Sequence, residues 1–204
     1  MIHLALFDLE PEIENAFLRW YEAEHAPSIL ARSGWRRLRH YRCLDGYPFL
    51  SLYELDDDLP LQRPLSAAPF RRGPFTARGL RNYHARTWRE IHAAGIPSAE
   101  GRWINAVTVE IDVGDRERFD RWYNRVHVPE ILDCPGWRSN RRFECIDDES
   151  SVLAIYEIDD PEVAFGSPEW ESVVGWDEHV EHIRGFHGFR VYGLMFDQAA
   201  HDSR

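Results

Sequence analysis

Residues 19–30 read RWYEAEHAPSIL, and residues 121–132 read RWYNRVHVPEIL. The two stretches are 102 positions apart and share seven of twelve residues. The match continues at the same spacing with GWR at residues 34–36 and 136–138. Self-similarity at a fixed offset is the signature of a duplicated structural unit. The sequence therefore predicts two tandem repeats of one fold.

The length of 204 residues suits one large domain or two small ones, and the duplication favours two. We expect a first repeat over residues 1–92, a linker over 93–101, a second repeat over 102–197 and a polar tail over 198–204. Hydrophobic residues make up 44% of the chain, too many for a disordered protein. Charges interrupt every apolar run before it could span a bilayer, so a soluble globular protein is expected.

All 24 basic residues are arginine, and 35 acidic residues give a net charge of -11. Nucleic acid and anionic membranes attract segregated basic patches, so neither is an expected partner. The three cysteines have no metal-ligand spacing, and the N-terminus lacks the charged region of a signal peptide. We expect a cytoplasmic protein whose partner is a small hydrophobic or aromatic metabolite. A homodimer of the duplicated chain stays open.

Each repeat begins with a strand and a helix. Residues 2–6 and 106–109 alternate as half-buried strands do. The helix that follows carries a stripe with one member every four residues: Phe17, Tyr21 and His25, then Phe119, Tyr123 and His127. A proline two residues after each histidine, Pro27 or Pro129, disfavours helical angles in the residue before it. We therefore expect the helix to end or kink there.

The rest of each repeat predicts two strands, a second helix and a final strand. The two strands form a hairpin, because residues 45–46 (DG) and 147–150 (DDES) are turn sequences. The second helix is expected over residues 161–185, whereas four prolines make its counterpart in the first repeat short or broken. The expected strands cover residues 35–43, 49–55 and 82–91, then 137–145, 151–158 and 187–196.

This β-α-β-β-α-β order is the split βαβ, or ferredoxin-like, arrangement and belongs to the α+β class. One such repeat has helices on one face of its sheet and leaves the other face bare. Two repeats in one chain can cover each other's bare faces. We therefore expect an α+β fold of two tandem ferredoxin-like repeats, packed sheet to sheet as an intramolecular pseudo-dimeric α+β barrel.

The chain resembles the dimeric α+β barrel superfamily and, within it, the EthD-like proteins. The resemblance rests on an aromatic-Tyr-x3-His-x-Pro stretch and a following glycine, at residues 20–34 and 122–136. It covers both repeats and implies a fused pseudo-dimer with a small apolar pocket in each repeat, whose polar groups are a histidine and a tyrosine. The superfamily includes polyketide cyclases, muconolactone isomerases, small monooxygenases, decarboxylases and haem-binding proteins. The resemblance therefore implies no single reaction.

His127 and His25 are the expected catalytic acid–base groups, because a histidine at a helix end beside a tyrosine can exchange a proton near neutral pH. Tyr123 and Tyr21 are their expected hydrogen-bonding partners. In the alternative, structural interpretation each histidine caps its helix and each tyrosine belongs to the core. The second repeat is the favoured active one, because only it has a carboxylate, Glu130, three residues after the histidine. A solvated Glu130 is the alternative.

Further substrate contacts are expected from the strands and the helix. Tyr156 and Tyr53 lie mid-strand on the expected pocket side. Arg141 and Arg39 could hold a substrate carboxylate or enolate, with ion pairing to nearby acidic residues as the alternative. Trp122 is the last expected substrate contact. In the alternative interpretation it packs in the core or between the repeats.

The sequence predicts neither a cofactor nor a metal. It contains none of the glycine-rich or nucleophile motifs of nucleotide-binding proteins and hydrolases. His179, His182 and His187 form a local cluster, but their spacing matches no standard zinc pattern. A polar last helical turn is the expected explanation.

The predicted function is a cofactor-free enzyme that acts on a small aromatic or polyketide-like metabolite by His/Tyr proton transfer. The reaction would be an isomerisation, cyclisation, elimination or decarboxylation. Two alternatives stay open: a cofactor-free monooxygenase of a phenolic substrate, and a non-catalytic binding protein for a hydrophobic metabolite or haem.

Overall fold

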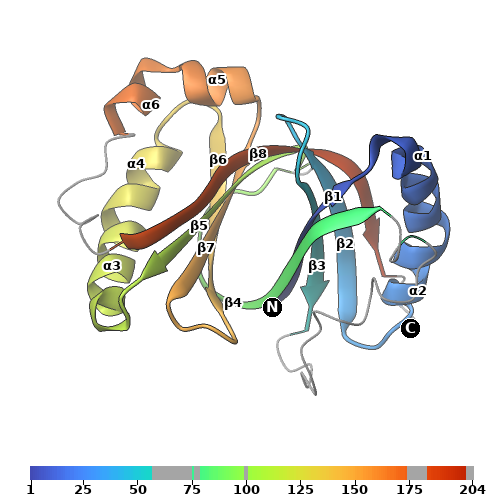
Figure 1. Cartoon of the computed structure of the whole chain (residues 1–204). Coiled ribbons are helices and arrows are strands. Elements are labelled where there is room, and N and C mark those ends of the chain that lie inside the picture. The colour runs from blue at the N-terminus through green and yellow to red at the C-terminus, as the bar shows by residue number, and fades with distance from the viewer. Residues whose placement is uncertain (57–74, 76–78, 99–100, 174–182, 201–204) are drawn as a thin grey trace. The chain divides into compact units, whose positions relative to one another are not determined.

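The computed structural model describes residues 1–56, 75, 79–98, 101–173 and 183–200. The chain divides into two compact units (Figure 1). Unit 1 comprises residues 1–89 and 194–204, and unit 2 comprises residues 90–193.

Unit 1 contains the first repeat, in which a helical segment follows the first strand. Its elements are β1 (Ile2–Leu9), α1 (Pro11–Trp20), the π-helical turn η1 (Tyr21–His25), α2 (Ala26–Leu30), β2 (Trp35–Cys43), β3 (Phe49–Leu55) and the first part of β4 (Leu80–Gly95). The sheet has the antiparallel order β4-β1-β3-β2. The last part of β8 (Ile183–Ala199) continues it beyond β2, where the Ala200 N–H donates to the Arg36 carbonyl over 2.7 Å.

Unit 2 contains the second repeat with the same order. Its elements are β5 (Trp103–Ile111), the 3-10 turn η3 (Val113–Asp115), α3 (Arg116–Trp122), the π-helical turn η4 (Tyr123–His127), α4 (Val128–Leu132), β6 (Trp137–Cys145), β7 (Ser151–Ile158), α5 (Pro161–Gly166), α6 (Pro168–Val173) and the first part of β8. The sheet order is β8-β5-β7-β6, again antiparallel. The end of β4 continues it beyond β6, where the Ile96 N–H donates to the Arg138 carbonyl over 3.0 Å.

Helices lie against one face of the sheet in each unit (Figure 1). In unit 1 the alternating residues Ala5, Phe7 and Leu9 of β1 pack with Phe17 of α1 in one buried cluster. In unit 2 Val107, Val109 and Ile111 of β5 pack in the same way with Phe119. The two-residue period of a strand puts these side chains on one face, and their burial fixes the helix on it. The predicted α+β class and the tandem ferredoxin-like repeats are therefore confirmed.

The helix does not end at the proline, which corrects the sequence prediction. Ala26 and Val128 have helical angles, with φ of -59° and -64°. The turn before each proline instead widens into a π-helix, in which the Ala26 N–H donates to the Tyr21 carbonyl and the Val128 N–H to the Tyr123 carbonyl. A π turn lengthens the hydrogen-bond step from four residues to five, which makes room for a proline ring that an α turn would exclude.

The final strands are longer than expected. β4 runs to Gly95, so the first three residues of the expected linker belong to a strand, and β8 includes the first two residues of the expected tail. Within the helix expected over residues 161–185, residues 161–173 hold two short helices, α5 and α6, and residues 183–185 belong to β8, where Ile183 pairs with Ile111. Residues 174–182 lie outside the described residues. The broken helix expected in the first repeat lies almost entirely outside the described residues.

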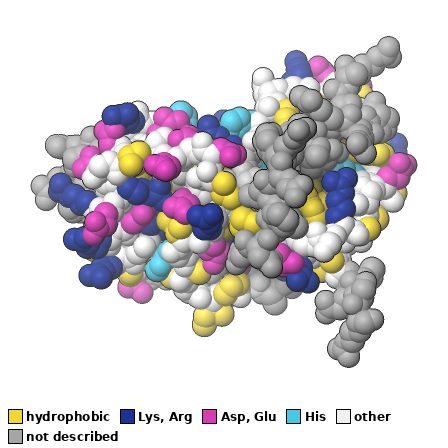
Figure 2. All heavy atoms as spheres, turned by 90° about the horizontal axis from the view of Figure 1, so that it is seen from below, with side chains coloured by type: hydrophobic (Ala, Val, Ile, Leu, Met, Phe, Trp, Pro, Cys, Tyr) yellow, Lys and Arg dark blue, Asp and Glu magenta, His cyan; other side chains and the backbone are white. Residues whose placement is uncertain are grey.

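Exposed arginines are paired with acids in both units. Arg36 pairs with Asp56 over 2.5 Å and Arg138 with Asp159 over 2.7 Å. The face in Figure 2 shows arginine side chains next to acidic ones. This agrees with the interpretation of the arginine clusters as ion-paired surface. None of the described helices combines the length and the apolar character needed to cross a membrane.

Candidate active site

The Tyr-x3-His-x-Pro motif of the second repeat and the neighbouring strand β7 place two tyrosines and a histidine together in unit 2. The Tyr156 hydroxyl, from β7, donates to the Tyr123 hydroxyl, from η4, over 3.1 Å. The rings of Tyr123 and His127 are 4.7 Å apart, because the π turn keeps residues four apart on one side of the helix. Trp122 stacks on His127 with its ring 5.0 Å away. The four side chains thus form one cluster between β7 and the helix.

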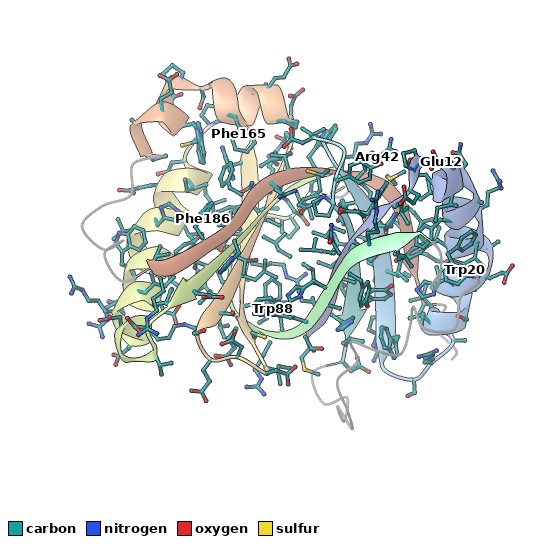
Figure 3. The ribbon with its side chains drawn as sticks, in the orientation of Figure 1. Glu12, Trp20, Arg42, Trp88, Phe165 and Phe186 are labelled. Carbon is teal, nitrogen blue, oxygen red and sulfur yellow. The ribbon has the colours of Figure 1, made fainter. Side chains whose placement is uncertain are left out.

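This cluster borders a cavity of about 350 Å³. One wall is aromatic, with the rings of Trp137 and Trp170 stacked 4.6 Å apart. Phe186 and Phe189 on β8 are 47% and 41% exposed, which identifies them as the mouth. Figure 3 shows Phe186 on the β8 ribbon. The lining residues are Asn105, Val107, Tyr123, His127, Ile131, Trp137, Tyr156, Trp170, Phe186 and Phe189.

A buried arginine lies beneath the cluster, and sequence analysis missed it. The Arg142 guanidinium is 4.2 Å from the centre of the Tyr123 ring, and the side chain is fully buried. It donates to the Asp120 carboxylate and the Asn124 amide oxygen, both over 2.6 Å. Unit 2 therefore holds a fixed positive charge under the ring of Tyr123.

A sequence signal for this arginine existed in the differences between the repeats. The residues 102 positions before Arg142, Asp120 and Asn124 are His40, Leu18 and Glu22. Three positions that contact one another thus changed together. A charged residue in the middle of a strand, facing a helix that has gained a carboxylate, indicates a buried ion pair.

Burial sets the protonation states in unit 2. Burial and, as a smaller cause, the nearby Arg142 cation together lower the pKa of His127 to about 4. Burial raises the pKa of Tyr123 and of Tyr156, while Arg142 opposes both shifts. At neutral pH the imidazole is therefore neutral and able to accept a proton, and both hydroxyls keep theirs as hydrogen-bond donors.

The equivalent residues of unit 1 satisfy one another. The Tyr53 hydroxyl is 3.0 Å from His25 Nε2. The Tyr21 hydroxyl donates to the Tyr53 hydroxyl over 3.3 Å. His40 Nδ1 is 3.0 Å from the Ser51 hydroxyl. Burial lowers the pKa of His25 to about 4 and that of His40 to about 3. His25 is only 3% exposed, whereas His127 is half-buried.

The predicted arginines and the predicted carboxylate lie apart from these clusters. Arg39 pairs with Glu54 over 2.5 Å, and Arg141 pairs with Glu90 over 2.5 Å. Strand alternation puts both arginines on the sheet face opposite to the tyrosines. Glu130 is exposed on α4. None of the three lines the cavity, and ion pairs hold both arginines, so their contact with a substrate stays a prediction.

The histidine cluster of the second repeat is only partly visible. His179 and His182 lie outside the described residues. His187 Nε2 is 3.0 Å from the Glu110 carboxylate on an exposed part of unit 2. Across the described ranges, no three His, Cys, Asp or Glu side chains are grouped so that they could hold a metal ion.

No protein-family model matches the sequence, and a search of curated proteins found no similar one. Solved structures are similar in fold. An anthrone oxidase-like protein has a TM-score of 0.73 at 13% identity, over 100% of this chain and 94% of that one. A candidate monooxygenase from Lactobacillus acidophilus has a TM-score of 0.64 at 12% identity, over 98% and 95%. A candidate monooxygenase from Fusobacterium nucleatum has a TM-score of 0.66 at 8% identity, over 97% and 93%.

Identities this low show the fold and leave the activity open. The chain shares the α+β fold of these solved structures and carries it as two repeats. Its placing within the dimeric α+β barrel superfamily and the EthD-like proteins stays a resemblance.

Proposed function

We propose that unit 2 binds a small, planar aromatic or polyketide-like metabolite and transfers a proton from it to His127. The observation that carries this proposal is the position of a neutral imidazole and a hydroxyl pair on the wall of an aromatic cavity. A cavity of about 350 Å³ is at the small end of ligand sites, which suits a molecule of about two or three fused rings.

Two groups with different protonation states divide the work. His127 takes a proton from an acidic carbon or a phenolic oxygen of the substrate. Tyr123 accepts the hydrogen bond of Tyr156, so its own proton is available to the substrate oxygen on which negative charge develops. The pKa of His127 then rises, because the new anion beside it stabilises the imidazolium.

Arg142 supports the same charge from below. Its guanidinium is held by Asp120 and Asn124 and lies against the Tyr123 ring, so it needs no rearrangement when the anion forms. A fixed cation in a buried site stabilises a nearby anion more than one in water would. Arg142 acts through Tyr123 and is a positioning residue.

The first repeat supplies the matched control for this proposal. In unit 1 the hydroxyls and the imidazole bind one another, and His40 stands where Arg142 stands in unit 2. We therefore assign the reaction to the second repeat, with His25, Tyr21 and Tyr53 as structural counterparts.

The resulting anion can rearrange, eliminate or lose carbon dioxide, or it can react with oxygen. Oxygenation is the second candidate, because three of the fold neighbours are described as an anthrone oxidase-like protein and as candidate monooxygenases. Both outcomes begin with the same proton transfer. A pocket of this size suits haem less well than a molecule of two or three rings.

Anthrone is a suitable probe, because its methylene protons are acidic and its anion is delocalised over three rings. Exchange of those protons for deuterium under nitrogen measures proton transfer alone. Oxygen uptake in air measures oxygenation, in which one anthrone and one O2 give one anthraquinone and one water. We expect His127→Ala to slow the catalysed exchange by about 10²–10⁴-fold and His25→Ala to change it by less than about twofold.

Three results would contradict parts of this proposal. An equal loss of exchange rate in His127→Ala and His25→Ala would contradict the assignment of the reaction to unit 2. If deuterium exchange of anthrone with the protein were no faster than in buffer alone, the protein would not catalyse proton transfer from molecules of this class. Binding of the probe without exchange, unchanged by His127→Ala, would favour a binding protein.

A further inference from the structure

Asn105 is a buried polar residue on the cavity wall that the proposed proton transfer does not use. It lies on β5 and is fully buried. In the register of the sheet it is directly opposite Tyr156 of β7, so both side chains face the helices. Among the residues that the structure describes, its amide oxygen has no hydrogen-bond partner. A buried acceptor without a partner costs about 1–3 kcal/mol unless a ligand or water binds it.

The first repeat gives the residue at the same position a side-chain partner on the neighbouring strand. His3 occupies it in unit 1, and its Nδ1 is 3.0 Å from the Thr87 hydroxyl on the neighbouring strand. In unit 2 the residue opposite Asn105 on that strand is Val191. The second repeat has therefore lost the side-chain partner while keeping a polar residue at the position.

A single hydrogen bond fixes which end of the amide is available. The Asn105 Nδ2 donates to the Arg190 backbone carbonyl over 3.2 Å. A carbonyl can only accept, so the nitrogen must be on that side and Oδ1 on the other. Oδ1 cannot donate. A ligand group that meets it must therefore carry a proton.

We propose that Asn105 Oδ1 accepts a hydrogen bond from a hydroxyl group of the substrate, so that unit 2 selects hydroxylated aromatic molecules over their methyl ethers. This specificity rests on the proposed function, because it concerns the same cavity. The aromatic wall supplies affinity for any planar ring system, and among such rings Asn105 favours those that donate a hydroxyl proton to its acceptor.

The test compares two probes of equal ring size, 1-naphthol and 1-methoxynaphthalene, at pH 7, where naphthol is uncharged. Both can accept a hydrogen bond from Tyr123, but only naphthol can donate one. Dissociation constants are measured for the unaltered protein, for Asn105→Leu and for His3→Leu, the matched substitution in the first repeat. Asn105→Ser, which keeps an acceptor, is a second variant if Asn105→Leu does not fold.

We expect the unaltered protein and His3→Leu to bind naphthol at least about tenfold more tightly than its ether. Asn105→Leu should bring that ratio close to one, and Asn105→Ser should keep part of it. Equal binding of both probes by the unaltered protein would overturn the inference and leave the aromatic cavity standing. An unchanged ratio of the two dissociation constants in Asn105→Leu would also overturn the inference, because another group would then bind the hydroxyl. Failure of both probes to bind would count against the proposed function itself.

Discussion

The two repeats carry the same Tyr-x3-His-x-Pro turn, yet they use it differently. In unit 1 Tyr53 connects Tyr21 and His25 in one hydrogen-bonded set beneath the helix. In unit 2 the hydroxyls of Tyr156 and Tyr123 bond to each other on the wall of a cavity. The motif fixes the backbone of the turn, and the residues opposite it on the sheet decide whether its polar groups bond to one another beneath the helix or line a cavity.

The surroundings differ most in charge. Unit 1 places two buried histidines, His3 and His40, around its turn, whereas unit 2 has Asn105 and Arg142 at these positions. Neutral imidazoles can satisfy hydrogen bonds without a buried charge, while the Arg142 cation needs Asp120 and Asn124 to hold it. The first arrangement suits a packed core and the second suits a site where negative charge develops.

The largest expected contrast between the units is in how much stability each loses at acidic pH. Burial lowers the pKa of His3 and His25 to about 4 and of His40 to about 3, from about 6.5 in an unfolded chain. Between pH 6.5 and 4 the unfolded chain binds these protons and the folded unit does not, so the free energy of unfolding falls as the pH falls. Each histidine contributes on the order of 3 kcal/mol to this loss.

Hydrogen exchange followed by mass spectrometry should therefore show β1 to β3 losing protection at a higher pH than β5 to β7. The control is His3→Asn, which gives unit 1 the residue that unit 2 has at that position and should make the loss shallower. Equal loss of protection in both units across this pH range would contradict the contrast.

The second contrast concerns Arg142 and His40. Arg142→Met should lower the free energy of unfolding by about 2 kcal/mol, because it leaves the Asn124 amide oxygen without its donor and leaves Asp120 with Arg116 as its remaining ion-pair partner. His40→Met should cost only about 1 kcal/mol, because it removes a neutral hydrogen bond. Urea denaturation measures both.

A double variant sharpens this comparison. The double variant Arg142→His with Asp120→Leu gives unit 2 the residues that the first repeat has at these positions, His40 and Leu18. It should recover more than half of the free energy of unfolding that Arg142→Met loses. In Arg142→Met the pKa of His127 should rise, because a nearby cation is gone. An NMR titration in which that pKa stays unchanged would argue against the coupling.

The smallest contrast is between two tyrosines on matching strands. Tyr156→Phe removes the hydrogen bond to Tyr123 and should lower anthrone exchange about tenfold, equivalent to about 1.4 kcal/mol. Tyr53→Phe removes the partner of His25 and should lower the free energy of unfolding by about 1 kcal/mol with little effect on exchange. Steady-state rates and melting curves separate the two results. Identical profiles would mean that the repeats are functionally equivalent.

Much of the site followed from local pattern. The four-residue spacing of Tyr123 and His127 placed both on one side of a helix, and strand alternation placed Tyr156 facing them. Local pattern was wrong about the residue before each proline, because the rule that disfavours helical angles there assumes an α turn and does not foresee the π turn.

The sequence by itself determined the duplication, the order of elements and the faces of the strands, because these depend on residue spacing along one segment. Tertiary structure alone decided that Arg142 lies under Tyr123, that Arg141 points to an ion pair, and that Asn105 lacks the partner His3 has. These features depend on which strands are neighbours and in what register. Burial, charge and hydrogen-bond satisfaction are properties of surroundings that come from distant parts of the chain.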